Sequence, residues 1–336
     1  MRSLQIPRFG PPEVLRIVTG PDPEPGPGEV LVAVEYSGVN FSDIMARMGL
    51  YPDAGRPPIV PGYEFAGTVR SVGAQVTDLV AGDPVVGLRN FGAHTDLLVA
   101  RSENVLRRPP GVDAVRGAAF PVVYLTAWHA LVRMGNLRAG ERILVHNAGG
   151  GLGTAAVQIA RHLGAVVWGT ASPSKHDLLR GLGVTEVFDY REWPARVRAL
   201  TGGAGVEFIL DPIGGRNLAL GFESLAHTGR IVACGTSGFA PGLKRNPLHL
   251  MLELLRWPRF NALRMIVKNR GAFGVHLGHL WHRPDLLREE IGEILELLER
   301  GVLDPVIDRV VPAGEAASAH RLLQERRNRG KVVLAW

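Results

Sequence analysis

The sequence predicts an α/β protein of two domains, a doubly wound parallel sheet and a smaller, partly open β-barrel. Residues 1–120 hold short Val-rich runs separated by Gly and Pro, which is typical of β-structure. From residue 121 apolar runs alternate with helix-like stretches, the pattern of a parallel sheet with helices on both faces. The length of 336 residues also favours two domains.

Each element can be placed in chain order from apolar runs bounded by turn residues. The barrel strands are expected at 29–34, 65–69, 83–87 and 96–99. The parallel strands are expected at 143–147, 166–170, 186–189, 206–211 and 230–234 and, after a helical insertion, at 272–275. The last segment reads as helix 285–300, strand 306–311, helix 313–327 and strand 331–335, and it is expected to return to the barrel. The predicted domains are therefore 1–120 with 277–336, and 121–276.

A glycine-rich turn follows the first parallel strand. Glycines at such a place let the backbone approach a pyrophosphate, and the next helix offers its N–H groups and positive dipole end to the phosphates. The first glycine of the G-x-G-x-x-G pattern is replaced by Ala148, so the strand–turn–helix context carries the prediction rather than the motif alone. We expect a dinucleotide here, with contacts from Ala148, Gly150, Gly151, Leu152 and Gly153.

The turn after the second parallel strand indicates which dinucleotide is bound. An acidic residue about 20 positions beyond Gly150 would usually hold the ribose of NAD, and none is present. The turn offers the hydroxyl of Ser172 and the ammonium of Lys175, which suit a 2′-phosphate, and Tyr190 could close over the same phosphate. We therefore expect NADPH. The alternative for Lys175 is a solvated lysine on the first turn of a helix.

Composition argues against several other classes. Hydrophobic residues make up 46% of the chain, enough for a globular core. No apolar run is long enough to span a membrane and the N-terminus lacks a signal-peptide core, so we expect a cytoplasmic protein. The single cysteine, Cys234, excludes an internal disulfide and a cysteine-cluster zinc site. The net charge of +6 comes mainly from scattered arginines, so nucleic-acid binding is not expected.

Several stretches together resemble the medium-chain dehydrogenase/reductase superfamily over essentially the whole chain. They are 25–32, 37–43, 61–64, 125–128, the glycine turn and 330–334. The resemblance implies a Rossmann nucleotide-binding domain and a GroES-like catalytic domain. Zinc alcohol dehydrogenases of this superfamily carry a cysteine where Asn40 stands and Gly-His-Glu where this chain has Gly62-Tyr63-Glu64. The resemblance therefore implies no catalytic metal and points to the zinc-free quinone oxidoreductases, with residues 40–51 and 273–278 similar to VAT-1-like members.

This resemblance implies a reductase that passes hydride from NADPH to quinones or α,β-unsaturated carbonyls. Without a metal, hydride must reach an already electron-poor carbon, and the charge that develops on the carbonyl oxygen needs a hydrogen-bond donor. Asn40 and Tyr51 match family positions beside the nicotinamide and are the candidate donors. The alternatives are a capping role for Asn40 and an ordinary half-buried tyrosine at 51. Met45 stands where simpler quinone reductases have a second tyrosine.

The remaining cofactor contacts come partly from the resemblance and partly from the sheet. The resemblance places Thr126 near the nicotinamide ribose, the backbone of Phe273 and Val275 at the carboxamide, and Lys331 at the phosphates. The alternatives are a helix cap for Thr126 and a surface lysine at the strand end for Lys331. Residues at the carboxyl end of the fifth parallel strand lie where such sheets bind ligands, and these are Gly235, Thr236 and Ser237.

Segment 243–270 is basic and apolar together, and its role stays open between peripheral membrane contact, a roof over the substrate cleft and a subunit contact. The resemblance implies a homodimer paired through the edge of the nucleotide-binding sheet. Two other functions also stay open: an NADPH-binding, VAT-1-like protein with a membrane or partner role, and an enoyl reductase of secondary metabolism. His276, His279 and His282 are spaced by three, but no carboxylate partner is evident from the sequence, so no metal site is expected.

Overall fold

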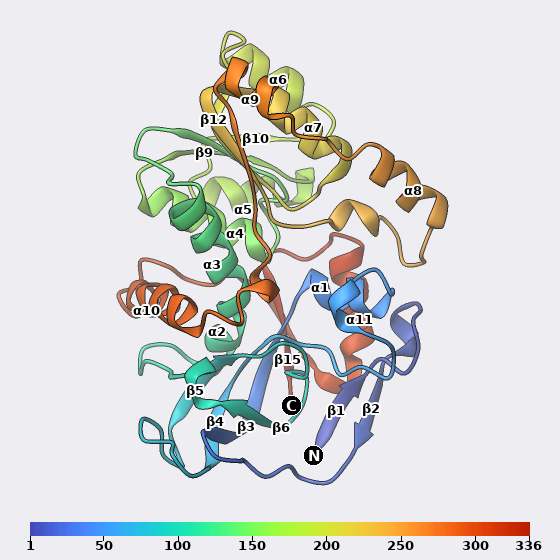
Figure 1. Cartoon of the computed structure of the whole chain (residues 1–336), viewed down its shortest axis with the longest axis vertical. Coiled ribbons are helices and arrows are strands. Elements are labelled where there is room, and N and C mark those ends of the chain that lie inside the picture. Colours follow the sequence, from blue (N-terminus) through green and yellow to red (C-terminus); the bar gives the residue numbers. More distant parts are fainter. The chain divides into compact units, whose positions relative to one another are not determined.

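A computed structural model describes all residues, 1–336, and divides them into two compact units (Figure 1). Unit 1 comprises Met1–Leu125, Gly242–Arg245 and Gly278–Trp336, and unit 2 comprises Thr126–Pro241 and Asn246–Leu277. The boundaries expected from the sequence, after 120 and after 276, lie within a few residues of these. The short return of the chain to unit 1 at 242–245 was not expected.

Unit 2 is built on a six-stranded parallel sheet. Its strands are β8 (Arg142–Val145), β9 (Val166–Thr170), β10 (Glu186–Phe188), β11 (Val206–Asp211), β12 (Leu225–Ala233) and β13 (Gly271–Gly274). They lie in the order β10-β9-β8-β11-β12-β13, and every neighbouring pair is parallel. This is the doubly wound order in which the first and fourth strands lie side by side at the centre, so ligand contacts are expected at the carboxyl ends of the strands.

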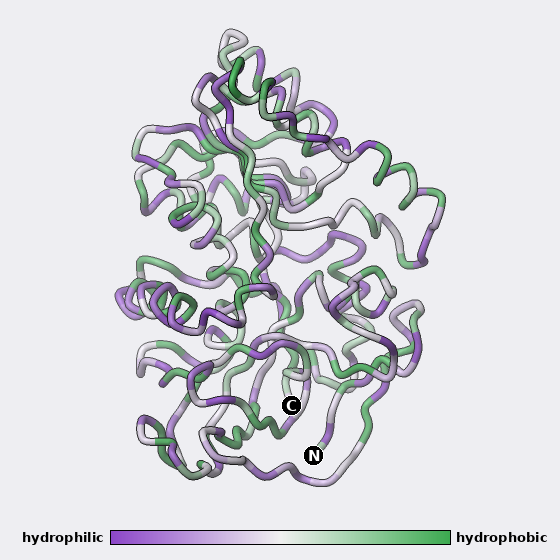
Figure 2. Tube along the Cα trace, viewed as in Figure 1, coloured by the Kyte–Doolittle hydropathy of each residue, from purple (hydrophilic) through white to green (hydrophobic).

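The helices of unit 2 alternate with these strands. They are α4 (Gly151–His162), α5 (His176–Gly181), α6 (Trp193–Leu200), α7 (Gly215–Glu223), α8 (Pro247–Leu255) and α9 (Ala262–Lys268), with α3 (Pro121–Trp128) crossing the unit boundary. A core of fully buried apolar side chains, among them Leu144, Phe188 and Trp193, fixes helices against the sheet. By contrast, no residue of α8 or α9 is buried, although hydrophobic stretches lie along both helices (Figure 2).

Unit 1 contains a strongly bent, mostly antiparallel sheet. Its order is β14 (Ile307–Pro312), β15 (Lys331–Ala335), β3 (Glu29–Val39), β4 (Glu64–Val72), β5 (Pro84–Leu88) and β7 (Val105–Arg107), and β6 (Leu97–Arg101) also pairs with β3. The long strand β3 pairs with three partners and shifts register against β4 twice, which bends the sheet toward a partly open barrel. The C-terminal strand β15 pairs with β3, so the chain returns to this unit as the sequence predicts.

Unit 1 also contains a hairpin and four helices. They are the hairpin β1 (Arg2–Gln5) and β2 (Arg16–Thr19) and the helices α1 (Phe41–Arg47), α2 (Ala114–Ala119), α10 (Pro284–Glu299) and α11 (Ala316–Gln324). The helix expected at 313–327 is shorter, because residues 313–315 form a 3₁₀ turn before α11. None of the helices in either unit combines the length and the hydropathy needed to cross a membrane.

Candidate functional site

The glycine turn of unit 2 joins β8 to α4 in a tightly packed arrangement. Asn147 adopts a left-handed conformation with φ of 54°, and its carbonyl accepts a hydrogen bond of 3.0 Å from the Gly150 N–H. Helix α4 begins at Gly151, and a Cβ on Gly153 would clash with the Asn147 carbonyl and lie 2.5 Å from the Ala148 Cα. Only glycine at 153 permits this approach of helix to strand, which turns the N-terminal N–H groups of α4 toward the turn.

The departure from the glycine pattern at Ala148 is accommodated on the neighbouring strand. Ala148 is fully buried, and its N–H donates a 3.0 Å hydrogen bond to the Thr170 carbonyl at the end of β9. A Cβ on Gly169 would lie only 2.9 Å from the Cβ of Ala148. The methyl group of Ala148, which stands where the motif has glycine, therefore occupies the space that Gly169 leaves free.

Lys175 lies against the glycine turn rather than in solvent. Its residue exposure is 5%, and a Cβ on Gly149 would lie 2.7 Å from its Cδ. The Ser172 hydroxyl lies 3.3 Å from that of Ser174 in the same loop. The alternative of a solvated surface lysine is therefore wrong, and the structure brings Lys175 to the turn, with Ser172 in the same loop as Lys175.

A hydrogen-bond chain links the carboxyl ends of three strands in unit 2. The Tyr190 hydroxyl, after β10, donates to Asn147 Oδ1 at 2.9 Å, and Asn147 Nδ2 donates to the Ser237 hydroxyl, after β12, at 3.3 Å. Below the turn, the His146 ring lies 3.0 Å from the Thr170 hydroxyl, and burial lowers its pKa to about 4, so the ring is neutral at pH 7. Tyr190 and Ser237 were both expected from the sequence, and the structure places them with the turn.

Asp211 was not expected to have a role, yet it shapes the carboxyl end of β11. It is fully buried, and its Oδ1 accepts hydrogen bonds from the N–H groups of Ile213 at 2.6 Å and Gly214 at 2.9 Å. Its Oδ2 accepts a further bond from Asn217 Nδ2 at 3.0 Å. The signal in the sequence is a carboxylate that ends an apolar strand and is followed by a Pro-Ile-Gly-Gly turn.

The other expected cofactor residues of unit 2 have varied surroundings. Thr126 lies inside α3, so the helix-cap alternative for it is wrong. Gly235 and Thr236 follow β12, and a Cβ on Gly235 would lie 2.8 Å from the Pro212 carbonyl oxygen. Phe273 is partly exposed on β13, whereas the Val275 N–H donates to the Ala233 carbonyl at 2.9 Å. The N–H of Val275 is therefore used within the sheet and is not free for a carboxamide.

In unit 1, Asn40, Glu64 and Lys331 form a buried cluster. The Lys331 ammonium lies 2.5 Å from both Asn40 Oδ1 and Glu64 Oε1, and Lys331 is only 3% exposed. Asn40 Nδ2 donates to Glu64 Oε1 at 2.7 Å and to the Gly38 carbonyl at 3.3 Å, while Glu64 Oε2 accepts from the Val122 N–H at 2.7 Å. Lys331 is therefore not the surface lysine of the alternative interpretation. Its ammonium is bound by a carboxylate and an amide instead of pointing to a free phosphate site.

Asn40 is the N-cap residue of helix α1, and Asp43 completes the capping box. Asp43 Oδ2 accepts from the Asn40 N–H at 2.8 Å, and Asp43 Oδ1 accepts from the Gly62 N–H at 2.8 Å. Burial opposes ionisation of Asp43, but His94, whose Nε2 lies 3.4 Å away, outweighs it together with the other partners and holds the pKa of this carboxyl below its usual range. The capping alternative for Asn40 is therefore consistent with the structure, and its side chain also contacts Glu64 and Lys331.

Tyr51 belongs to a group of three aromatic side chains in unit 1. Its ring centroid lies 6.3 Å from that of Tyr63 and 6.1 Å from that of Phe91, with both pairs near edge-to-face. Burial raises the pKa of Tyr51 to about 12, so the phenol keeps its proton at neutral pH and can donate a hydrogen bond. A role for Tyr63 and Phe91 was not expected from the sequence.

The side chains at positions 40, 63 and 64 do not suit a catalytic zinc ion. Zinc prefers thiolate, imidazole and carboxylate ligands, whereas this chain offers an amide, a phenol and a carboxylate that is already bound to the Lys331 ammonium. Elsewhere in unit 1, His279 Nε2 lies 3.0 Å from Asp53 Oδ2, so one of the three regularly spaced histidines does have a carboxylate partner. That premise of the sequence analysis was wrong; the pair is exposed at the surface.

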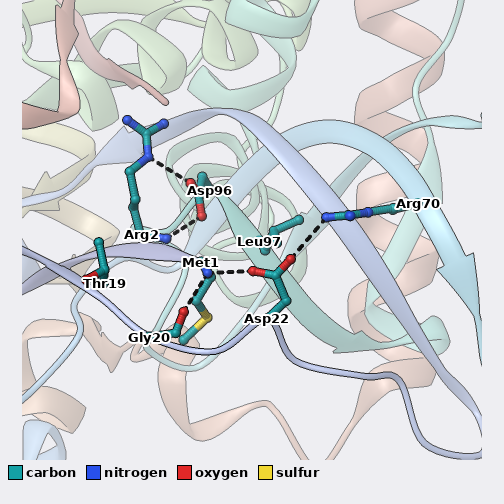
Figure 3. A pocket seen from close by; sticks show the side chains of 8 residues that line it. All are labelled: Met1, Arg2, Thr19, Gly20, Asp22, Arg70, Asp96 and Leu97. Atoms are coloured by element: carbon teal, nitrogen blue, oxygen red, sulfur yellow. Dashed lines mark hydrogen bonds and ion pairs between the residues drawn. The ribbon is translucent and has the colours of Figure 1, made fainter.

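A separate hollow of about 480 Å³ lies near the N-terminus of unit 1 (Figure 3). Its charged groups pair with one another: Arg2 Nε lies 2.8 Å from Asp96, and Asp22 accepts from the Met1 amino group at 2.6 Å and from Arg70 at 3.5 Å. The lining contains none of the residues expected to bind cofactor or substrate.

Comparison with known proteins identifies the family. A model of the alcohol dehydrogenase GroES-like domain matches residues 26–136, and a model named zinc-binding dehydrogenase matches residues 182–334. The synaptic vesicle membrane protein VAT-1 homolog of Rattus norvegicus is 36% identical over 343 residues, covering 99% of this chain and 84% of the relative. The chain belongs to the medium-chain dehydrogenase/reductase superfamily. The predicted family and its pairing of a GroES-like with a Rossmann domain are thereby confirmed.

Two solved structures show how far this medium-chain dehydrogenase/reductase chain resembles others. Quinone oxidoreductase from Escherichia coli, complexed with NADPH, superposes with a TM-score of 0.88 at 26% identity, covering 100% of both chains. The CurK enoyl reductase superposes with a TM-score of 0.86 at 26% identity, covering 99% of this chain and 98% of that one. Over its whole length the chain therefore resembles oxidoreductases of this superfamily.

Proposed function

We propose that this protein is an NADPH-dependent, zinc-independent reductase that transfers hydride to quinones or α,β-unsaturated carbonyls. The observation that carries the proposal is the position of Lys175, which is buried against the glycine turn. It lies in the loop after β9, and the end of β9 lacks the acid that would hold the ribose of NAD. The likeness to an NADPH-bound quinone oxidoreductase supports the choice of cofactor.

In this proposal each part of unit 2 near the turn holds one part of the dinucleotide. The N-terminal N–H groups of α4 and the glycines of the turn bind the pyrophosphate, because the missing side chains leave the backbone accessible. Lys175 and Ser172 bind the 2′-phosphate by charge-assisted hydrogen bonds, and Tyr190 stabilises the turn through Asn147. When bound, NADPH supplies the hydride.

Unit 1 supplies the group that binds the acceptor. The protonated Tyr51 phenol donates a hydrogen bond to the carbonyl oxygen, on which negative charge builds as hydride arrives. Both N–H groups of Asn40 are already bonded to Glu64 and Gly38, so we assign Asn40 an indirect role in this cluster. The ammonium of Lys331 beside Asn40 and Glu64 also supports a reaction without zinc.

The test is NADPH oxidation by the purified protein against a panel of quinones and enones, with NADH alongside. The wild type is expected to prefer NADPH, and Lys175→Ala is expected to lose roughly 10- to 100-fold of that preference, the value of a charge-assisted hydrogen bond. Lys244→Ala, at an exposed lysine of unit 1, is the matched control and should leave the preference unchanged. Preference for NADH, or no effect of Lys175→Ala, would contradict the cofactor assignment.

A second candidate function is an NADPH-binding protein whose role is contact with a membrane, and the exposed surface of α8 favours it. Leu248, Leu254 and Leu255 on this helix are largely exposed, and Arg256 and Arg259 follow them. Binding of NADPH without reduction of any acceptor, together with flotation on anionic phosphatidylserine vesicles that Leu255→Glu abolishes, would favour this candidate. Turnover of a quinone without vesicle binding would favour the reductase.

A further inference from the structure

Tyr51, Tyr63 and Phe91 form a compact aromatic triad in unit 1. Tyr63 immediately precedes β4, and its ring centroid lies 4.9 Å from that of Phe91 in the loop after β5. Tyr51 and Phe91 also pack on the apolar side chains of Ile6 and Ile59. The triad therefore has an apolar base and carries two phenol groups.

The backbone around the triad is held in place by hydrogen bonds between two loops. The Arg89 N–H donates to the Tyr63 carbonyl at 2.9 Å, and the Gly92 N–H donates to the Val60 carbonyl at 2.9 Å. Between these two bonds, Phe91 adopts a left-handed conformation with φ of 64°. Such a conformation is unfavourable for an aromatic residue and persists only where the surroundings enforce it, which is common at ligand-binding sites.

The hydroxyl of Tyr63 is the unusual group of the triad. Tyr63 is 5% exposed, and its hydroxyl is buried without a hydrogen-bond partner of standard geometry. Burial raises the pKa of Tyr63 far above its usual range, against a smaller lowering by Ser42. Burying a hydroxyl without a partner is unfavourable, and a phenylalanine would fill the same space without that cost.

We propose that Tyr63 is a second oxygen-binding residue of the reductase, acting with Tyr51 on the acceptor. The inference rests on the proposed function. The Tyr63 phenol interacts with the Ser42 and Tyr51 side chains but makes no hydrogen bond of standard geometry with them. It gains such a bond when an acceptor oxygen binds, and this bond strengthens as negative charge builds on that oxygen. Phe91 fixes the acceptor by ring contacts, because aromatic edges and faces pack well on a flat conjugated ring. The acceptor class that fits is a quinone rather than an acyclic enone.

The first experiment compares Tyr63→Phe with Tyr36→Phe, a half-buried tyrosine of β3 outside the triad. With 1,4-naphthoquinone as acceptor, Tyr63→Phe is expected to lower kcat/KM roughly 10- to 100-fold, to leave KM for NADPH unchanged and to keep or raise Tm. Tyr36→Phe should match the wild type in all three. A kcat/KM for Tyr63→Phe equal to that of the wild type would overturn the proposal.

The second experiment tests the ring contact. Phe91→Leu is expected to reduce kcat/KM for 1,4-naphthoquinone more than for the acyclic enal trans-2-hexenal, because leucine keeps an apolar contact but loses the ring. An equal fall for both acceptors would overturn the assignment of Phe91. If the wild type reduces neither acceptor, the proposed function itself fails and the inference falls with it. Wild-type turnover with an unaffected Tyr63→Phe overturns the inference alone.

Discussion

At the scale of single residues, Lys331 shows how burial decides a role. Glu64 is fully buried and shares its Oε1 with Lys331 and Asn40. Removing one partner of a buried ion pair leaves an uncompensated charge, so Lys331→Met is expected to lower the free energy of unfolding by about 3–5 kcal/mol. Urea denaturation measures this, and Lys331→Met with Glu64→Gln should recover much of the loss. Arg180→Met, which breaks an ion pair with Asp177 at the surface, is the control and should cost no more than about 1 kcal/mol.

The same variant distinguishes the buried pair from the phosphate contact expected from the sequence. A phosphate ligand would show itself as weaker NADPH binding at unchanged stability, which would contradict the structural role. The sequence could not reveal this pairing, because Asn40 and Lys331 are 291 positions apart and only the return of β15 to β3 brings them together. The absence of cysteine at 40 and of histidine at 63, in contrast, is read directly from the sequence, and the expectation of a zinc-free site stays a prediction.

At the scale of elements, Ala148 in the β8–α4 turn and Gly169 in β9 complement each other in size. Gly169→Ala would place a second methyl against Ala148, so we expect a loss of about 1–3 kcal/mol in unfolding free energy. Ala148→Gly in the same chain should restore most of it by making room, and it completes the G-x-G-x-x-G pattern at 148, 150 and 153. Gly181→Ala, at the end of α5 with no atom near its Cβ position, is the control. Chemical denaturation of Gly169→Ala, Ala148→Gly, the double variant and the control measures the coupling, and simply additive changes would contradict the complementary packing.

Which elements could be predicted from the sequence follows from how they are buried. The six parallel strands were all found, because strands buried on both faces are continuous apolar runs. Strands β1, β2 and β7 were missed because they are short and their pairing is decided by distant residues, and β2 is largely exposed. The triad of Tyr51, Tyr63 and Phe91 was missed for a similar reason, because the rings come from separate loops and the sequence does not show that these loops meet.

At the scale of the whole molecule, unit 2 has a strand edge and an apolar helix surface that are left exposed within one chain. Strand β13 is the last strand of the parallel sheet, so its outer edge has no strand partner. Three apolar residues of α9, the helix before it, are largely exposed: Leu263 at 69%, Ile266 at 70% and Val267 at 71%. Its charged residues Arg264 and Lys268 are paired with Glu223, so the remaining surface of α9 is mainly apolar. Exposed apolar surface of this kind usually marks an interface.

We propose that a second copy of the chain covers this surface, so that the protein is a homodimer joined through β13 and α9 of unit 2. Sedimentation velocity should show a dimer for the wild type. Ile266→Glu combined with Val267→Glu should give a monomer that still binds NADPH, because charge is costly at an apolar interface while the glycine turn is untouched. Val80→Glu, at an exposed valine of unit 1, should remain dimeric. A monomeric wild type that floats with anionic vesicles would instead assign the apolar surface to a membrane, and a dimer that survives the double substitution would place the interface elsewhere.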